Sequence, residues 1–189
     1  MLIRDIAKIQ TGILAKPEAA GDVVYLQAKH FDENGKLQSA LKPDLKAGYS
    51  SKKHLLKHGD VLFAAKGSKN FATCYENENA PAVASTSFFV IRLVTDTILP
   101  KFLVWYLNYS KTQRFLKANA AGTSMVSISK SVLEDLEIPG PTIEEQQLIL
   151  QITDLQNQEK QLRKQINLLH EKRVQHSIEK LIRQSASIF

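Results

Sequence analysis

Several things are scarce in this 189-residue sequence, and each scarcity excludes a class of protein. The single cysteine, Cys74, rules out an intramolecular disulfide and a cysteine-rich zinc site, so we expect it to be a small buried apolar side chain. No apolar run reaches the roughly 18 residues that a membrane-spanning helix needs. The opening segment, residues 1–5, does not resemble a signal peptide. These absences predict a soluble cytoplasmic protein with no membrane partner.

Catalytic motifs are missing as well. There is no Gly-x-Gly nucleotide loop, no Asp/Asn-Pro-Pro-Tyr aminomethyltransferase motif, no Gly-x-Ser-x-Gly elbow and no His-Glu-x-x-His zinc motif. Residues 66–70 lack the spacing of a P-loop. Residues 43–46 contain the proline, aspartate and lysine of a nuclease motif, but these residues are too close together in the sequence for such a site. His54 and His58 are four residues apart but lack a third ligand. We predict a protein that binds rather than catalyses, with no catalytic residue, metal or cofactor.

Two parts of the sequence are rich in basic residues and contain few or no acidic ones. Residues 42–69 contain seven lysines against two aspartates, and residues 97–133 contain five basic residues and no acid. The whole chain has a formal net charge of +6. Two basic blocks in one domain favour a polyanionic partner such as nucleic acid, although a solvated lysine-rich surface explains the same charges.

Glycine and proline are both absent between Thr142 and Gln184. Thr142 and Glu145 have the spacing of a helix capping box, and Pro139 and Pro141 prevent an earlier helix. Apolar residues then alternate in steps of three and four, the pattern of a coiled-coil seam: Leu148, Ile152, Leu155, Leu162, Ile166 and Leu169. A helix of roughly 40 residues is about 60 Å long. Such a helix needs another helix to cover its stripe.

The predicted organisation is an α+β fold, with a globular mixed domain over residues 1–141 followed by a long coiled-coil helix over residues 142–189. We expect a short opening helix over residues 2–7, a turn at 10–12 and a helical turn within 51–56. The further expected elements are strands over 23–28, 61–65, 72–75 and 82–94, and helices over 97–109, 111–121 and 132–136. Gly122 is expected to end the second of these helices.

The order of these parts resembles one half of the DNA-specificity subunit of type I restriction–modification systems. The segments that carry the resemblance span nearly the whole chain: Ile6–Gly12, Lys57–Phe63, Ala84–Leu93, Leu99–Leu107, Gly122 with Ile128, and Leu136–Gln146. Each is loose alone, and their order and spacing make the match. Full specificity subunits carry two such units in tandem, whereas this chain has one.

The resemblance implies a non-catalytic subunit that reads double-stranded DNA. Its domain would be a target-recognition domain that reads a short base sequence in the major groove, and its helix would be a spacer. DNA methyltransferase subunits would dock on this scaffold and methylate adenine, and a motor-nuclease restriction subunit would be a further partner.

For contact with DNA, the sequence offers polar and basic loops. We predict that bases are read by Lys66, Ser68, Lys69, Asn70, Thr123 and Ser124, because lysine reaches guanine acceptors and asparagine pairs with adenine. Phosphates are predicted to be bound by Lys52, Lys53, Arg114, Lys117 and Lys130.

A homodimer would cover the apolar seam. Glu159 and Arg173 occupy seam positions seven residues on either side of Ile166, so antiparallel pairing brings them together and parallel pairing sets like charges against each other. A two-fold dimer would read an interrupted palindrome whose halves are one to two DNA turns apart, about 34–36 Å each. The alternative is a coiled-coil adaptor that binds an acidic protein and does not recognise DNA.

Overall fold

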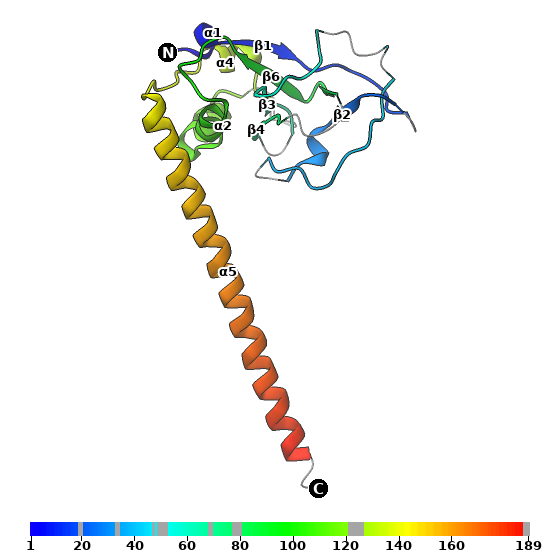
Figure 1. Cartoon of the computed structure of the whole chain (residues 1–189), viewed down its shortest axis with the longest axis vertical. Helices are drawn as coiled ribbons and strands as arrows, with labels where there is room; N and C mark the ends of the chain where they lie inside the picture. The colour runs from blue at the N-terminus through cyan, green and yellow to red at the C-terminus, as the bar shows by residue number, and fades with distance from the viewer. Residues whose placement is uncertain are drawn as a thin grey trace. The chain divides into compact units, whose positions relative to one another are not determined.

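The computed structural model describes residues 1–18, 21–32, 35–46, 48, 53–67, 70–76, 81–120 and 127–186. The chain divides into two compact units, Met1–Gln147 and Leu148–Phe189. The first is a mixed α+β unit, and the second is helical (Figure 1). The predicted fold class, a mixed domain with a long C-terminal helix, is therefore confirmed.

A four-stranded antiparallel sheet forms the centre of the first unit. Its strands lie in the order β1 (Ala7–Thr11), β6 (Phe88–Leu93), β3 (Val61–Ala64) and β4 (Ala72–Cys74). The apolar strand β6 is central, as its composition predicts, and its Ile91 pairs with both Ile9 and Val61. The expected turn at residues 10–12 is wrong for its first two residues, because Gln10 and Thr11 continue β1 and pair with Val90 and Phe89.

A second sheet contains two parallel strands, β2 (Val24–Leu26) and β5 (Ala82–Ala84). All six residues are buried, as is usual for parallel strands covered on both faces. The single strand expected over residues 82–94 is in fact two, β5 and β6, separated at Ser85–Ser87. Gly12 passes so close to this break that a Cβ atom would lie 2.1 Å from the Ser85 carbonyl oxygen, so only glycine fits there.

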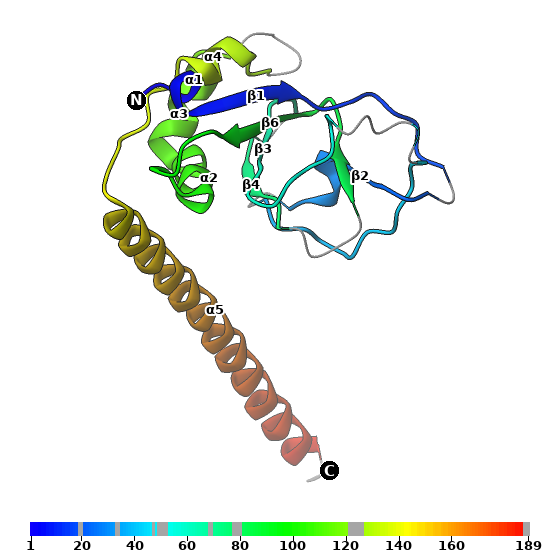
Figure 2. The same cartoon turned by 45° about the horizontal axis from the view of Figure 1, so that its top comes forward.

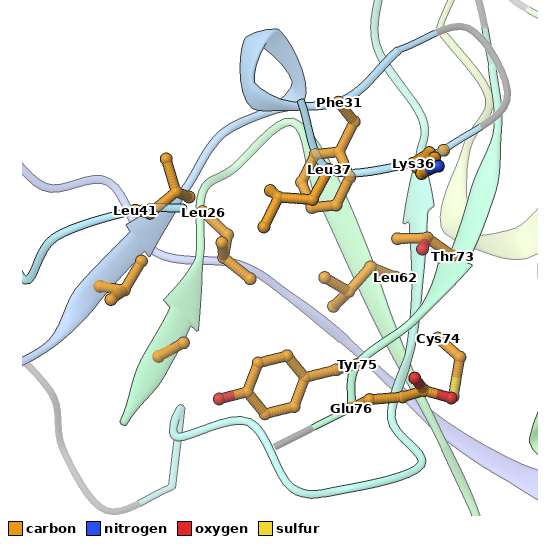
Figure 3. A pocket seen from close by; sticks show the side chains of 13 residues that line it. Leu26, Phe31, Lys36, Leu37, Leu41, Leu62, Thr73, Cys74, Tyr75 and Glu76 are labelled. Atoms are coloured by element: carbon orange, nitrogen blue, oxygen red, sulfur yellow. The ribbon is translucent and has the colours of Figure 1, made fainter. Parts of the chain in front are cut away.

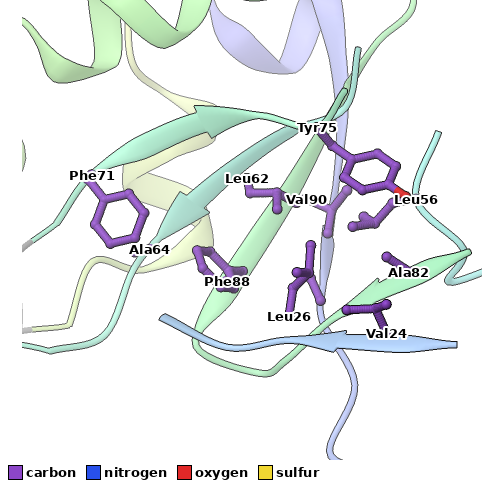
Figure 4. Close-up of a cluster of buried hydrophobic side chains, with 11 residues drawn as sticks. Val24, Leu26, Leu56, Leu62, Ala64, Phe71, Tyr75, Ala82, Phe88 and Val90 are labelled. Carbon is purple, nitrogen blue, oxygen red and sulfur yellow. The ribbon is translucent and has the colours of Figure 1, made fainter. Parts of the chain in front are cut away.

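The main core lies between the two sheets (Figure 4). Val24 and Leu26 of β2 face Leu62 of β3 and Val90 of β6 within one cluster of buried side chains. Three phenylalanines close one end of it, with ring centroids 5.7 to 6.0 Å apart: Phe31, Phe71 and Phe88. Tyr25 points to the other face of β2, where it joins Val23, Leu45 and Val83. The alternation of β2 thus supplies two cores.

Short helices surround the sheets: α1 (Ile3–Ile6), the 3₁₀ turn η1 (Ala28–His30), α2 (Pro100–Asn108), α3 (Ser110–Ala118) and α4 (Lys130–Glu134). Pro100 begins α2, at the first helical position, where proline is favoured. Figure 2 shows α1 beside α4, and Ile3 N donates to Leu136 O at 3.0 Å there.

One predicted helix end in the first unit is wrong, and one predicted helical turn lies partly outside the described residues. Helix α3 ends at Ala118, where Asn119 is the capping residue and its Nδ2 donates to Phe115 O, so Gly122 does not end the helix. Within 51–56, the described residues 53–56 form a turn followed by a bridge from Leu55 to Val83. Asn119 thus caps α3 through a local hydrogen bond, and Leu55 is held by a long-range bridge to β5.

Helix α5 (Ile143–Ala186) begins with the predicted capping box. Thr142 N donates to Glu145 Oε2 at 2.8 Å, and Glu145 N donates to Thr142 Oγ1 at 3.3 Å. The first residues of α5 up to Gln147 belong to the first compact unit, and the remainder forms the second. No helix among the described residues is long and apolar enough to cross a membrane.

Candidate nucleic-acid interface

Lys66 lies where strand β3 leaves the core. Residues 61–65 are buried, and Lys66 is exposed directly after them. Its backbone forms a bridge with Ser127, and Ile128 N donates to Ala65 O at 3.0 Å. The bridge places Lys66, the first residue of the polar segment 66–70, beside Ser127, the residue that follows the polar segment 121–126. Two described residues about 60 positions apart in the sequence, each close in sequence to residues predicted to read bases, therefore lie side by side.

Asn70 closes the first of these loops. It is half-buried, and its Nδ2 donates to Ala64 O at 2.8 Å. Part of its hydrogen-bonding capacity thus holds the loop against the end of β3. The predicted contact of Asn70 with adenine stays a prediction, and it would have to use the remaining amide groups.

Helix α3 carries an exposed basic face. Thr112 and Leu116 are buried, whereas Arg114 and Lys117 are exposed. Neither Arg114 nor Lys117 forms an ion pair with another described residue. The chain runs from this helix to the segment 121–127 that ends beside Lys66. Helix α3 and the Lys66 loop are thus linked through a short stretch of chain.

The other predicted phosphate contacts lie elsewhere in the unit. Lys53 is exposed and precedes Leu56, whose N–H donates to Ala82 O of β5 at 2.9 Å, so Lys53 belongs with the two-stranded sheet. Lys130 begins α4 and forms an ion pair with Glu134 at 3.2 Å. No hydrogen bond or ion pair of the described residues joins either lysine to Lys66.

Five predicted contact residues fall outside the described part of the chain: Lys52, Ser68, Lys69, Thr123 and Ser124. The described residues closest to them in sequence are Lys53, Gly67, Asn70, Ala120 and Ser127.

A buried ion pair positions the basic segment 53–60, and sequence reasoning missed it. Asp60 is 1% exposed, and Arg92 Nε donates to its Oδ1 at 2.7 Å. Arg92 also donates to Leu55 O at 3.1 Å, and this ion-paired hydrogen bonding raises the pKa of Arg92. The signal was present in the sequence, because an arginine inside the apolar run Phe88–Leu93 needs a partner.

An apolar pocket of about 270 Å³ lies beside the main core (Figure 3). Its lining is mostly apolar, with polar groups from Lys36, Thr73 and Glu76. Burial raises the pKa of the Cys74 thiol at this site, and the hydrogen bond from Lys101 lowers the pKa of Glu76. Among the described residues, no three His, Cys, Asp or Glu side chains are grouped so as to hold a metal ion.

The seam of α5 is exposed along its length. The exposed fractions lie between 47% and 64% for the six predicted seam residues Leu148, Ile152, Leu155, Leu162, Ile166 and Leu169. Glu159 forms an ion pair with Arg163 of the same helix at 2.7 Å. A continuous apolar stripe of this kind marks an interaction surface.

Both the domain and the helix match one family description. A family model described as "Type I restriction modification DNA specificity domain" matches residues 1–168. The chain belongs to this specificity-domain family. No curated protein sequence matches the chain.

Solved structures of type I specificity subunits share the fold of this specificity-domain chain. The S subunit from M. genitalium has a TM-score of 0.57 at 18% identity, and the HsdS subunit from Thermoanaerobacter tengcongensis has 0.59 at 17%. A chain from a study of complex assembly and conformational transition in the type I R-M system has 0.62 at 17%. Each similarity covers 84% of this chain but only 37–38% of the other.

Proposed function

We propose that this chain is a sequence-specific DNA-binding specificity subunit of a type I restriction–modification system. The single observation that carries the proposal is the family match over residues 1–168, because it includes both the mixed domain and most of the seam. In this proposal residues 1–141 are a target-recognition domain and residues 142–189 are a spacer and dimerisation helix. The chain binds DNA and leaves catalysis to its partners.

The surface around Lys66 supports this assignment of the domain. The Lys66–Ser127 bridge gathers two polar loops, and α3 adds the exposed cations Arg114 and Lys117. Polar loops can reach base edges, whereas flanking cations bind phosphates and set the register. We propose that these loops face the major groove and that α3 faces the adjacent backbone.

The exposed seam of α5 supports a dimer. This chain spans less than two fifths of the length of the specificity subunits that share its fold. We propose that two copies pair antiparallel through the exposed seam and carry two recognition domains to the halves of an interrupted palindrome. The same seam is the feature that a coiled-coil adaptor would use, but the family match favours DNA recognition.

Partners follow from the family. We propose that adenine methyltransferase subunits dock on the dimer, and that a restriction subunit joins them. In this division of labour the partners supply the chemistry.

The proposal is tested by selection of duplexes from a random-sequence library, with the chain alone and with a type I methyltransferase subunit. We expect enrichment of one interrupted palindrome and an apparent Kd that weakens steeply as salt is raised. Arg114→Ala and Lys117→Ala should each reduce the slope of log K against log salt by about one. The matched control is Lys180→Ala on α5, which lies outside the proposed DNA surface and should leave the slope unchanged.

A salt-independent affinity, or enrichment of no sequence in either arm, would refute DNA recognition. An acidic protein captured instead, with no DNA bound, would favour the adaptor.

A further inference from the structure

Gln146 is a buried polar residue in the first turns of an otherwise exposed helix. It is 0% exposed, whereas its neighbours Glu145 and Gln147 are both exposed. A buried amide is costly unless its donors and acceptor are paired. The side chain must therefore have hydrogen-bond partners that offset the free-energy cost of its burial.

Every hydrogen-bonding group of the amide has a partner. The Nε2 atom donates to Thr97 O at 2.8 Å and to Pro141 O at 2.9 Å, and Oε1 accepts from Leu99 N at 2.8 Å. The two donors and one acceptor match two carbonyl groups and one N–H. No other common side chain of this size has the same set, because glutamate cannot donate twice and methionine cannot donate at all.

These three bonds join segments that are far apart in the sequence. Thr97 and Leu99 immediately precede α2, and Leu99 is its capping residue. Pro141 ends the linker before α5, and Gln146 lies within the helix itself. All four residues belong to the first compact unit. The beginning of α5 is thus fastened to the domain by the amide, in addition to its own capping box.

Helix α5 continues without interruption from this point to Ala186. In a dimer held by the seam at residues 148–169, the recognition domain is attached through the turns around Gln146. Any freedom at this attachment would allow the two domains to accept a range of separations along DNA. A firm attachment would restrict them to one.

We propose that Gln146 is a positioning residue that determines specificity, and that it sets the one half-site separation that the dimer accepts. This inference rests on the proposed function. It assigns no base contact to Gln146. The bases of each half-site are read by the domain, and the number of base pairs between the halves is set by the attachment of the domain to its helix.

Three variants weaken the attachment in different ways. Gln146→Glu replaces the donating amide with a carboxylate that faces the Thr97 and Pro141 carbonyl groups, and Gln146→Ala removes all three bonds. Leu99→Pro removes the N–H that donates to Oε1, along with the half-buried leucine side chain, and leaves the amide of Gln146 in place. The φ of −73° at Leu99 is one that proline adopts. Gln147→Glu is the matched control, since it makes the same change of charge on the exposed neighbouring residue.

The experiment is selection from a library of duplexes with random half-sites and spacers of varied length. For the wild type and Gln147→Glu we expect one spacer length. For the three attachment variants we expect the same half-site bases, several spacer lengths, and about tenfold weaker binding to the wild-type spacing. Circular dichroism and sedimentation show whether each variant keeps its fold and its dimer.

The outcomes separate the inference from the function on which it rests. If the wild type selects no paired half-sites, the proposed function fails. If folded attachment variants keep the single spacer length, the proposed function stands and the role of Gln146 is refuted. If all three variants lose their half-site bases or their fold, Gln146 is a residue of general stability, and its role in spacing is equally refuted.

Discussion

The two units of this chain use similar leucines and isoleucines for opposite purposes. Leu103 of α2 is 0% exposed, whereas Leu162 of α5 is 59% exposed. The mixed domain covers its apolar residues with its own sheets and helices, and α5 leaves its stripe uncovered. The domain therefore buries its own apolar side chains, and the proposed dimer would cover the stripe of the helix.

Charged pairs show the same contrast. Asp60 in the domain has a side chain that is 1% exposed, and Arg92 holds it, whereas Glu159 and Arg163 on α5 are 58% and 76% exposed. A buried carboxylate depends on its partner, but an exposed pair is screened by water. Four predictions test how far this contrast extends, in order of decreasing effect.

Leucine truncation should give the largest difference. Leu103→Ala is expected to lower the free energy of unfolding of the domain by about 4 kcal/mol, because it leaves a cavity in the core. Leu162→Ala should leave the domain unchanged and weaken the dimer instead. Urea titration followed by Trp105 fluorescence reports the domain, because Trp105 is the only tryptophan and lies in α2. A comparable loss of domain stability in both variants would contradict the contrast.

Breaking the two ion pairs should change stability by amounts that differ several-fold. Arg92→Leu leaves Asp60 buried without its partner and should cost about 3 kcal/mol of domain stability. Arg163→Leu on α5 removes an exposed pair and should change stability by at most about 0.5 kcal/mol. The same urea titration measures the first, and helix melting by circular dichroism measures the second. Equal losses of stability in the two variants would mean that the buried Asp60 carboxylate depends less on Arg92 than their geometry implies.

Asparagine truncation tests the open edge of the sheet. Asn108 Nδ2 donates to Ala72 O and its Oδ1 accepts from Ala72 N, both at 2.8 Å, so the side chain takes the place of a neighbouring strand on β4. Asn108→Ala should cost about 2 kcal/mol, since it leaves both backbone groups unpaired. Asn167→Ala on the exposed helix should cause no loss, because alanine favours helix. Hydrogen exchange at Ala72 provides a direct measurement.

Much of this architecture could be predicted from the sequence because local patterns dictate it. Thr142 and Glu145 at capping spacing, Pro100 at a helix start and the apolar run Phe88–Leu93 each depend on neighbours in sequence. Strand β1 could not be found this way, since its polar residues Gln10 and Thr11 are ordered by pairing with β6. Long-range hydrogen bonds decide such segments, and a single sequence does not display them.

The candidate site follows the same division. The basic character of residues 42–69 and 97–133 is visible in the sequence, but the bridge that brings Lys66 to Ser127 is not. Nor does composition show that Gln146 is buried and Gln147 exposed, since both are glutamines in one helical turn. The folded chain distinguishes them through Thr97 and Leu99, some 47 to 49 residues away in sequence.

The smallest expected effect tests the orientation of the dimer. If two copies of α5 cross antiparallel near Ile166, Glu159 of one copy comes near Arg173 of the other, and each contact is worth at most about 1 kcal/mol. Glu159→Arg should therefore weaken the dimer several-fold, and adding Arg173→Glu should restore it.

Glu159→Arg also sets two arginines side by side within one helix, because Glu159 pairs with Arg163 in the single chain. Glu159→Gln separates the two effects, since it removes the charge without adding that repulsion. Sedimentation equilibrium of the wild type, Glu159→Arg, Arg173→Glu and the double variant closes a double-mutant cycle, and Glu159→Gln is measured beside these four proteins. In a parallel dimer each residue would face its own copy, so the double variant would recover nothing, and that result would exclude the antiparallel arrangement.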